Sequence, residues 1–219
     1  MNVRIAALAL TLFASCATES HNVVATESVA TYNTNYSGPR YALAVGHFEN
    51  RSPYMRGLFS DGNDRLGGQA KTILQTHLSQ SGRFNLVDRS NMEALARESE
   101  ISGGQQNLTG AEVIITGEVT EFGRKVTGDK QLFGLAGRGK KQTAYSKVSI
   151  SVVDVATSLV VYSVQGAGEY ELASREVLGT GGTSGYDATL SDKVLNLSIT
   201  DAVNKLVAAL EAGAWSPVK

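Results

Sequence analysis

Hydrophobic positions along the chain change their spacing near residue 111. Before that point, an apolar run at 41–48 predicts a buried strand, and apolar residues at helical spacing within 64–82 predict a helix. A short strand is expected at 84–87 and a second helix at 91–100. Three side chains of this second helix are expected to face inward: Met92, Leu95 and Ala96.

The second part of the chain is β-branched and partly alternating, which is typical of strands. Long strands are expected at 112–126, 142–155 and 159–168, joined as an antiparallel meander. Residues 169–192 fit either a hairpin or an ordered loop, and residues 192–212 have the wide apolar face of a helix. This order predicts an α+β fold with a mixed or antiparallel sheet covered by helices, and with extended β-hairpins whose relation to a membrane the pattern leaves open.

The N-terminus has the layout of a secretory signal over residues 1–15: Arg4, a short apolar run and two small residues. The apolar run is about half the ~20 residues that a membrane-spanning helix needs. The stretch LFASC ends in Cys16, the only cysteine, and resembles a bacterial lipobox. That resemblance implies cleavage before Cys16, acyl chains at this residue (palmitate among them) and, because Ala17 follows, the outer membrane as destination. An ordinary signal peptide with an unmodified thiol is the alternative.

The composition along the chain indicates how it is divided into a tether and a domain. Residues 16–40 are rich in Thr, Ser, Asn and Ala, so we predict a flexible, lipidated tether there and one domain over 41–215. The chain is 42% hydrophobic, enough for a sizeable core. Its formal net charge of -1 provides no basic field, so nucleic acid is not an expected partner.

The sequence contains none of the residue patterns typical of the catalytic, metal-binding and phosphate-binding sites considered next. Its three histidines, His21, His47 and His77, have no metal-ligand spacing, so we expect no metal site and no cofactor. No G-x-S-x-G stretch is present, and GLAGRGKK at 134–141 only approaches a phosphate-binding loop because it lacks the final Ser or Thr. We therefore do not expect an enzyme.

Several stretches, in order, resemble the CsgG family of curli production assembly/transport lipoproteins. They are YALAVGHFENRS, GGQAKTILQTHLSQSGRFNLVDRSNMEAL, GAEVIITGEVTEFG and SKVSISVVDVATSLVVYSVQGAGE. The resemblance implies a lipid-anchored outer-membrane protein with a periplasmic domain, a homo-oligomeric ring whose hairpins form a transmembrane barrel, and exported protein cargo or accessory lipoproteins as partners. The hairpins would lie near 121–146 and 166–190, and a loop at 52–62 would narrow the channel. Its candidate side chains are Tyr54, Met55, Leu58 and Phe59.

A second hypothesis starts from the same strands. Neither face of the strand around Phe122 is an apolar band, because Arg124 and Lys130 interrupt one face and Glu121, Lys125 and Asp129 the other. The alternative function is therefore a periplasmic lipoprotein without a pore, which binds and regulates an envelope enzyme or a partner lipoprotein.

Overall fold

The structure is a computed structural model that describes residues 26–54, 63–130, 138–176 and 190–218. Within these ranges three helices and five strands form an α+β fold, as the sequence predicts. In chain order they are β1 (Tyr41–Asn50), α1 (Arg65–Gln80), β2 (Phe84–Val87), α2 (Met92–Ile101), β3 (Val113–Lys130), β4 (Arg138–Asp154), β5 (Val160–Glu176) and α3 (Leu190–Glu211).

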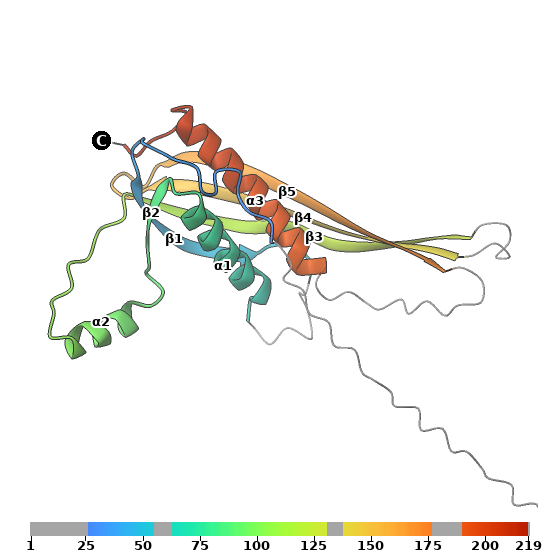
Figure 1. Cartoon of the computed structure of the whole chain (residues 1–219), viewed down its shortest axis with the longest axis horizontal. Helices are drawn as coiled ribbons and strands as arrows, with labels where there is room; N and C mark the ends of the chain where they lie inside the picture. The colour runs from blue at the N-terminus through green and yellow to red at the C-terminus, as the bar shows by residue number, and fades with distance from the viewer. Residues whose placement is uncertain (1–25, 55–62, 131–137, 177–189, 219) are drawn as a thin grey trace, which may run out of the picture.

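The five strands form one mixed sheet in the order β2-β1-β3-β4-β5. β1 runs parallel to β2 and β3, while β3, β4 and β5 form an antiparallel meander. The helix α1 connects the parallel pair β1–β2, because parallel strands need a crossover connection. α1 packs on β1 and β2, and α3 packs on β4 and β5, so both helices cover one face of the sheet (Figure 1).

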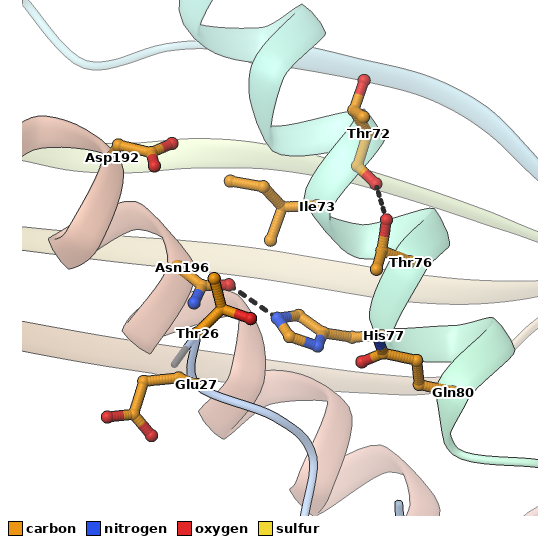
Figure 2. Close-up of a pocket in the computed structure, with 9 residues that line it drawn as sticks. All are labelled: Thr26, Glu27, Thr72, Ile73, Thr76, His77, Gln80, Asp192 and Asn196. Atoms are coloured by element: carbon orange, nitrogen blue, oxygen red, sulfur yellow. Dashed lines mark hydrogen bonds between the residues drawn. The ribbon is translucent and has the colours of Figure 1, made fainter. Parts of the chain in front are cut away.

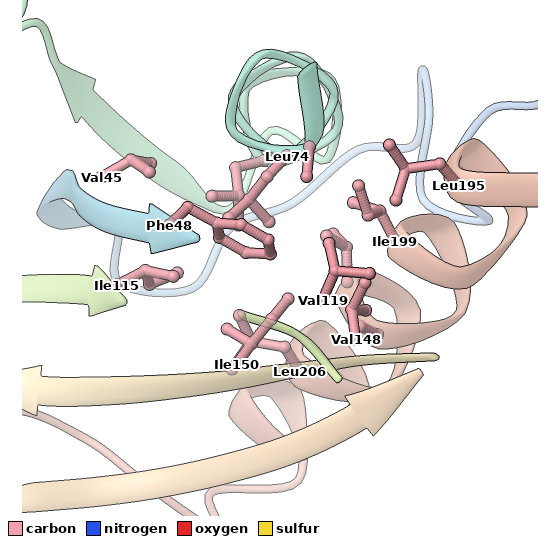
Figure 3. Packing of buried hydrophobic residues seen from close by; sticks show 14 of the residues in the cluster. Val45, Phe48, Leu74, Ile115, Val119, Val148, Ile150, Leu195, Ile199 and Leu206 are labelled. Atoms are coloured by element: carbon pink, nitrogen blue, oxygen red, sulfur yellow. The ribbon is translucent and has the colours of Figure 1, made fainter. Parts of the chain in front are cut away.

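The core lies between these two helices and the sheet. Asp64 begins α1, since its carboxylate accepts a hydrogen bond from the Gly67 amide at 2.8 Å. Leu74 of α1 and Ile199 of α3 are fully buried against strand residues such as Ile115 (Figure 3). Each buried side chain of this size contributes about 1.5–3 kcal/mol to folding.

The second helix differs from its prediction. α2 lies where 91–100 was expected, but none of its residues is buried and Leu95 is 43% exposed, so the expected inward face is wrong. The chain carries α2 away from the sheet between β2 and β3 (Figure 1). An amphipathic spacing reveals an apolar face, but it does not determine whether the same chain covers that face.

Part of the segment predicted to be a tether packs on the domain. Val29 is 2% exposed, and the Ala30 amide donates a hydrogen bond to Oδ1 of Asn204 on α3 at 2.8 Å. The guanidinium of Arg83 lies over the ring of Tyr36, 4.7 Å from its centroid. Residues 16–25, where the rest of this prediction falls, lie outside the described residues.

The last three strands are longer than the pattern predicts. β3 has 18 residues, and β4 and β5 have 17 residues each. Residues 169–176, which the sequence left open between hairpin and loop, continue β5. The remainder of that segment, 177–189, lies outside the described residues.

Candidate functional site at the base of the strand extension

Three strands continue beyond the helix-covered domain. β1 ends at Asn50 beside Val119 of β3, but the register of β3, β4 and β5 continues to the pairs Lys130↔Arg138 and Arg138↔Glu176. We call the portions 121–130, 138–147 and 167–176 of these strands the strand extension. Figure 1 shows the extension projecting from the domain as a three-stranded ribbon. About ten residues per strand give a length of about 33 Å. α3 covers the first few residues of each strand, so about 20 Å of the described extension lies beyond the helix.

The base of the extension has one covered face. Phe122 is 3% exposed, and the hydroxyls of Ser146 on β4 and Ser198 on α3 lie 3.0 Å apart in a buried contact. Arg124 donates a hydrogen bond from Nη2 to the Ser191 hydroxyl at 2.5 Å. Arg124, whose charge interrupts the apolar pattern of this strand, therefore contacts the first turn of α3.

Glycines bring α3 close to β5. A Cβ on Gly166 would collide with the backbone of α3 at Ser198, and a Cβ on Gly168 would lie 2.8 Å from Cβ of Leu197. Asp201 of α3 also accepts a hydrogen bond from the Ala167 amide at 3.0 Å. The G-A-G stretch at 166–168 is the sequence signal for this contact, but periodicity of apolar residues does not reveal it.

The other face of the base is polar. Lys147 forms an ion pair with Glu121 at 2.6 Å. At the end of β1, Arg51 contacts both Glu49 and Glu118, at 2.5 and 3.0 Å. The hydrogen bond between His47 and Glu49, followed by the charge of Arg51, holds the pKa of the Glu49 carboxyl below its ordinary value.

The loop predicted to narrow a channel begins at this base. Asn50 holds the turn: Oδ1 accepts hydrogen bonds from the Ser52 amide and hydroxyl, and Nδ2 donates to the Tyr54 carbonyl at 2.8 Å. The loop returns at Asp64, whose Oδ2 accepts from the Asn50 amide at 2.7 Å. Both ends of the loop are thus fixed beside the point where β3 leaves the domain.

The structure places only one of the four loop candidates. The ring of Tyr54 packs on Phe122 with centroids 4.6 Å apart, so it joins the loop to the first residues of the extension. Met55, Leu58 and Phe59 lie outside the described residues, as does Cys16. The side chains of 126–141 and 172–189, which would face a membrane, are also outside them.

The remaining sequence candidates do not join this base as a chemical site. His77 is buried between α1 and α3, and His47 is exposed at the end of β1. In the part of the chain that the structure describes, no three His, Cys, Asp or Glu residues form a group that could hold a metal ion. None of the described helices combines the length and hydropathy needed to cross a membrane.

The sequence profile of a family described as "Curli production assembly/transport component CsgG" matches residues 27–218. A protein of Neisseria meningitidis serogroup B, provisionally named lipoprotein NMB1126/NMB1164, is 58% identical over 215 residues, which is 98% of this chain and 96% of that protein.

Solved structures show weaker likeness. A chain of a PelC dodecamer from Paraburkholderia phytofirmans is 19% identical with a TM-score of 0.39, covering 78% of this chain and 94% of that one. The lipoprotein GNA1162 from Neisseria meningitidis is 15% identical with a TM-score of 0.36, covering 78% and 99%. Likeness at this level carries no conclusion about assembly.

Proposed function

This chain belongs to the CsgG family, and on that premise we propose that it is an outer-membrane lipoprotein of the curli assembly/transport type. It is acylated at Cys16, works on the periplasmic face of the outer membrane, and takes part in the export or assembly of surface protein as a homo-oligomeric ring channel. This role needs no catalytic step. The lipoprotein name of its 58% identical relative supports the acylation.

One observation carries the proposal: the first described residues of the chain and the strand extension lie at the same end of the domain. Ala30 contacts Asn204, whereas Thr26 lines a cavity together with Asp192, in the first turn of α3. The segment therefore runs back along α3 toward the residues that contact the extension, such as Ser191. A lipid and a projecting three-stranded ribbon on the same side suit a domain held against a membrane.

The contacts of Val29, Ala30 and Tyr36 with the domain shorten the free part of the N-terminal segment. Only residues 16–25 separate the proposed acyl chains from the domain. A flexible chain of about ten residues has a root-mean-square span of about 17 Å. The lipid thus holds the base of the extension within one bilayer thickness of the membrane surface, where the three strands of the extension can enter it.

The mass and shape of the full-length, lipidated protein in mild detergent test this function. Light scattering should give a mass several times that of one chain, and negative-stain images should show closed rings with a central hole. A monomer or dimer under the same conditions would contradict a channel. The chain with Cys16→Ala, purified in the same detergent, serves as the control for the effect of the lipid.

A second function rests on α2. Leu95 is 43% exposed and Ile101 is 73% exposed, although both are large apolar residues. A projecting helix with exposed large apolar side chains offers a surface that can bind another protein. We therefore keep as alternative a lipoprotein without a pore that regulates an envelope enzyme or partner lipoprotein through α2, and the same ring experiment separates the two.

A further inference from the structure

The outer edge of β5 is one of the two edges of the described sheet, whose strand order is β2-β1-β3-β4-β5. Every second residue of an edge strand directs its backbone N–H and C=O away from the sheet, where a strand of another chain can pair with them. Folded proteins prevent such pairing by placing charged side chains or bulges at the edge, or by covering it. The groups that occupy the edge of β5 therefore determine whether another chain can add to the sheet there.

Two side chains of α3 bind the outward backbone groups of β5. The Ala167 amide donates a hydrogen bond to Oδ2 of Asp201 at 3.0 Å, and Nζ of Lys205 donates to the Gln165 carbonyl at 3.1 Å. Nζ of Lys205 also lies 2.7 Å from the same Oδ2 of Asp201, so the two side chains form an ion pair along the strand. The pair supplies one acceptor and one donor, which are the two groups that the backbone of a neighbouring strand would supply.

The close packing of α3 on β5 makes these contacts possible. Gly166 lies between the two bonded residues of the strand, and a Cβ there would be 2.6 Å from the Ala202 amide nitrogen. Asp201 precedes Ala202, and Lys205 follows Asp201 by about one helical turn, so both side chains reach the same edge. Asn196 lies on another side of α3, where it faces α1 (Figure 2). The approach at Gly166 therefore brings a charged pair to the edge of β5.

A β-bulge interrupts the same edge nearer the start of β5. Val160 pairs with Val153 of β4 and Tyr162 pairs with Val152, so Val161 is an extra residue on this strand. A bulge disrupts the regular spacing of backbone groups and increases the local twist, which opposes pairing with a further strand. The part of β5 that belongs to the domain therefore has two separate obstacles to strand addition, the bulge and the charged pair.

The exposure of the charged pair indicates a role other than folding stability. The side chain of Asp201 is 37% exposed and that of Lys205 is 52% exposed. Ion pairs that are exposed to this extent contribute little to the free energy of unfolding. What the pair does change is the state of the strand edge, because without it the Gln165 carbonyl and the Ala167 amide are available to another chain.

We propose that Asp201 and Lys205 close the domain part of the β5 edge against a strand of a second copy of this chain, and so confine strand pairing between copies to the strand extension. A second copy has a suitable strand, because β3 beyond Val119 is not paired on its β1 side with any described strand. The confinement to the extension rests on the function proposed above. The closing of the edge does not, since it follows from the contacts of α3 with β5 alone.

The first test measures hydrogen exchange at single amides of the full-length, lipidated protein in mild detergent. In the double variant with Asp201→Ala and Lys205→Ala, the Ala167 amide should exchange about tenfold faster at low protein concentration, because it loses its charged acceptor. The matched control is the double variant with Glu93→Ala and Arg97→Ala. It removes an ion pair of the same spacing on α2, away from β5, and should leave exchange at Ala167 unchanged.

The second test follows association with rising protein concentration. Light scattering should give a larger mass for the Asp201→Ala, Lys205→Ala variant than for the unchanged chain, and the Ala167 amide should become protected again, because an added strand covers it. Lys205→Met keeps most of the side-chain volume but removes the donor, so it should also associate. Lys205→Arg keeps a donor and should behave as the unchanged chain does.

The proposal is overturned if the double variant, shown to be folded by circular dichroism, keeps the mass of the unchanged chain at every concentration. It is also overturned if Lys205→Arg associates as strongly as Lys205→Met. Should the double variant fail to fold, the comparison of Lys205→Met with Lys205→Arg decides alone. The proposed function is tested by the mass of the unchanged chain and this inference by the difference between variants, so either can fail without the other.

Discussion

Gly166 of β5 lies against the backbone of α3 at Ser198 without room for a Cβ between them. The helix that covers the base of the strand extension can approach the sheet this closely only because the strand has no side chain there. The contact includes the neighbouring Ser146–Ser198 pair of hydroxyls. The position of the extension relative to the domain therefore depends on the glycines of β5 at this contact, Gly166 among them.

Gly166→Ala should destabilise the protein by about 1–3 kcal/mol, the usual cost of overpacking a close contact. Urea unfolding followed by circular dichroism measures this change. Gly68→Ala is the matched control: no atom lies within 4 Å of an added Cβ there, and the site is within α1. Alanine in that helix should raise stability by about 0.5–1 kcal/mol. Equal effects of the two substitutions would contradict the close approach of α3.

Cys16→Ala should remove the acyl mass and move the protein from the membrane to the soluble periplasmic fraction. The physical reason is that the lipid holds the domain at the membrane before the strands can enter it. Mass spectrometry and cell fractionation check both results, with His21→Gln, outside the lipobox, as control. If the Cys16→Ala protein remains in membranes, the strand extension is a second anchor that works without the lipid.

Tyr54→Ala should alter export or conductance more than it alters stability, because it removes the contact between the loop and Phe122. We expect a loss of about 1 kcal/mol or more of folding free energy from the aromatic pair. Tyr54→Phe keeps the ring and is the control. Single-channel recording and thermal unfolding separate the two effects. Unchanged conductance in Tyr54→Ala would show that the start of the loop does not shape the proposed channel.

Leu95→Glu on α2 should leave the unfolding free energy within about 0.5 kcal/mol, because the side chain is already largely exposed. The substitution should instead reduce assembly with other chains or binding to a partner. Light scattering in detergent and pull-down from envelope extracts measure these. Leu74→Ala, buried on α1, should by contrast cost about 2–5 kcal/mol. Assembly and binding that both resist Leu95→Glu would exclude α2 as an interface.

The ionisation of Asp154 makes the free energy of unfolding depend on pH in the acid range. The hydrogen bond from the Thr157 hydroxyl at 2.6 Å, with backbone amides including that of Val218, holds the pKa of the Asp154 carboxyl below its ordinary value. A lowered pKa in the folded state contributes stability at pH above ~4, the unfolded value, and this contribution is lost as pH falls through the folded pKa.

Thr157→Ala removes the main cause, so it should raise this pKa and reduce the share of stability that Asp154 contributes above pH ~4. Urea midpoints measured from neutral to acid pH should therefore fall less steeply in Thr157→Ala than in the unchanged chain. Glu100→Gln, on the exposed α2, is the control and should leave the pH dependence unchanged. Identical curves for Thr157→Ala and the unchanged chain would refute the assignment to Asp154.

The sequence pattern predicted most elements because their signals are local. Apolar spacing and the Asp64 cap located α1, and β-branched alternation located β3 and β4. The inward face of α2 was predicted wrongly, since Leu95 has the right spacing but none of the described elements covers it. Of the candidate site, Tyr54 could be placed near a strand end, but its contact with Phe122 joins residues 68 positions apart and has no local signal.

By itself, the sequence determined the α+β order, the N-terminal lipobox pattern and the family, all of which depend on residues near one another in the chain. Only the tertiary structure showed which charged side chains form contacts within the domain. Arg124, read as an interruption of a membrane strand, contacts Ser191 on α3. The tertiary structure also brought Thr26 near the start of α3, at the end of the domain from which the strand extension projects. Such contacts arise from packing between segments that are distant in the chain. The spacing of apolar residues within either segment does not predict how the two pack together.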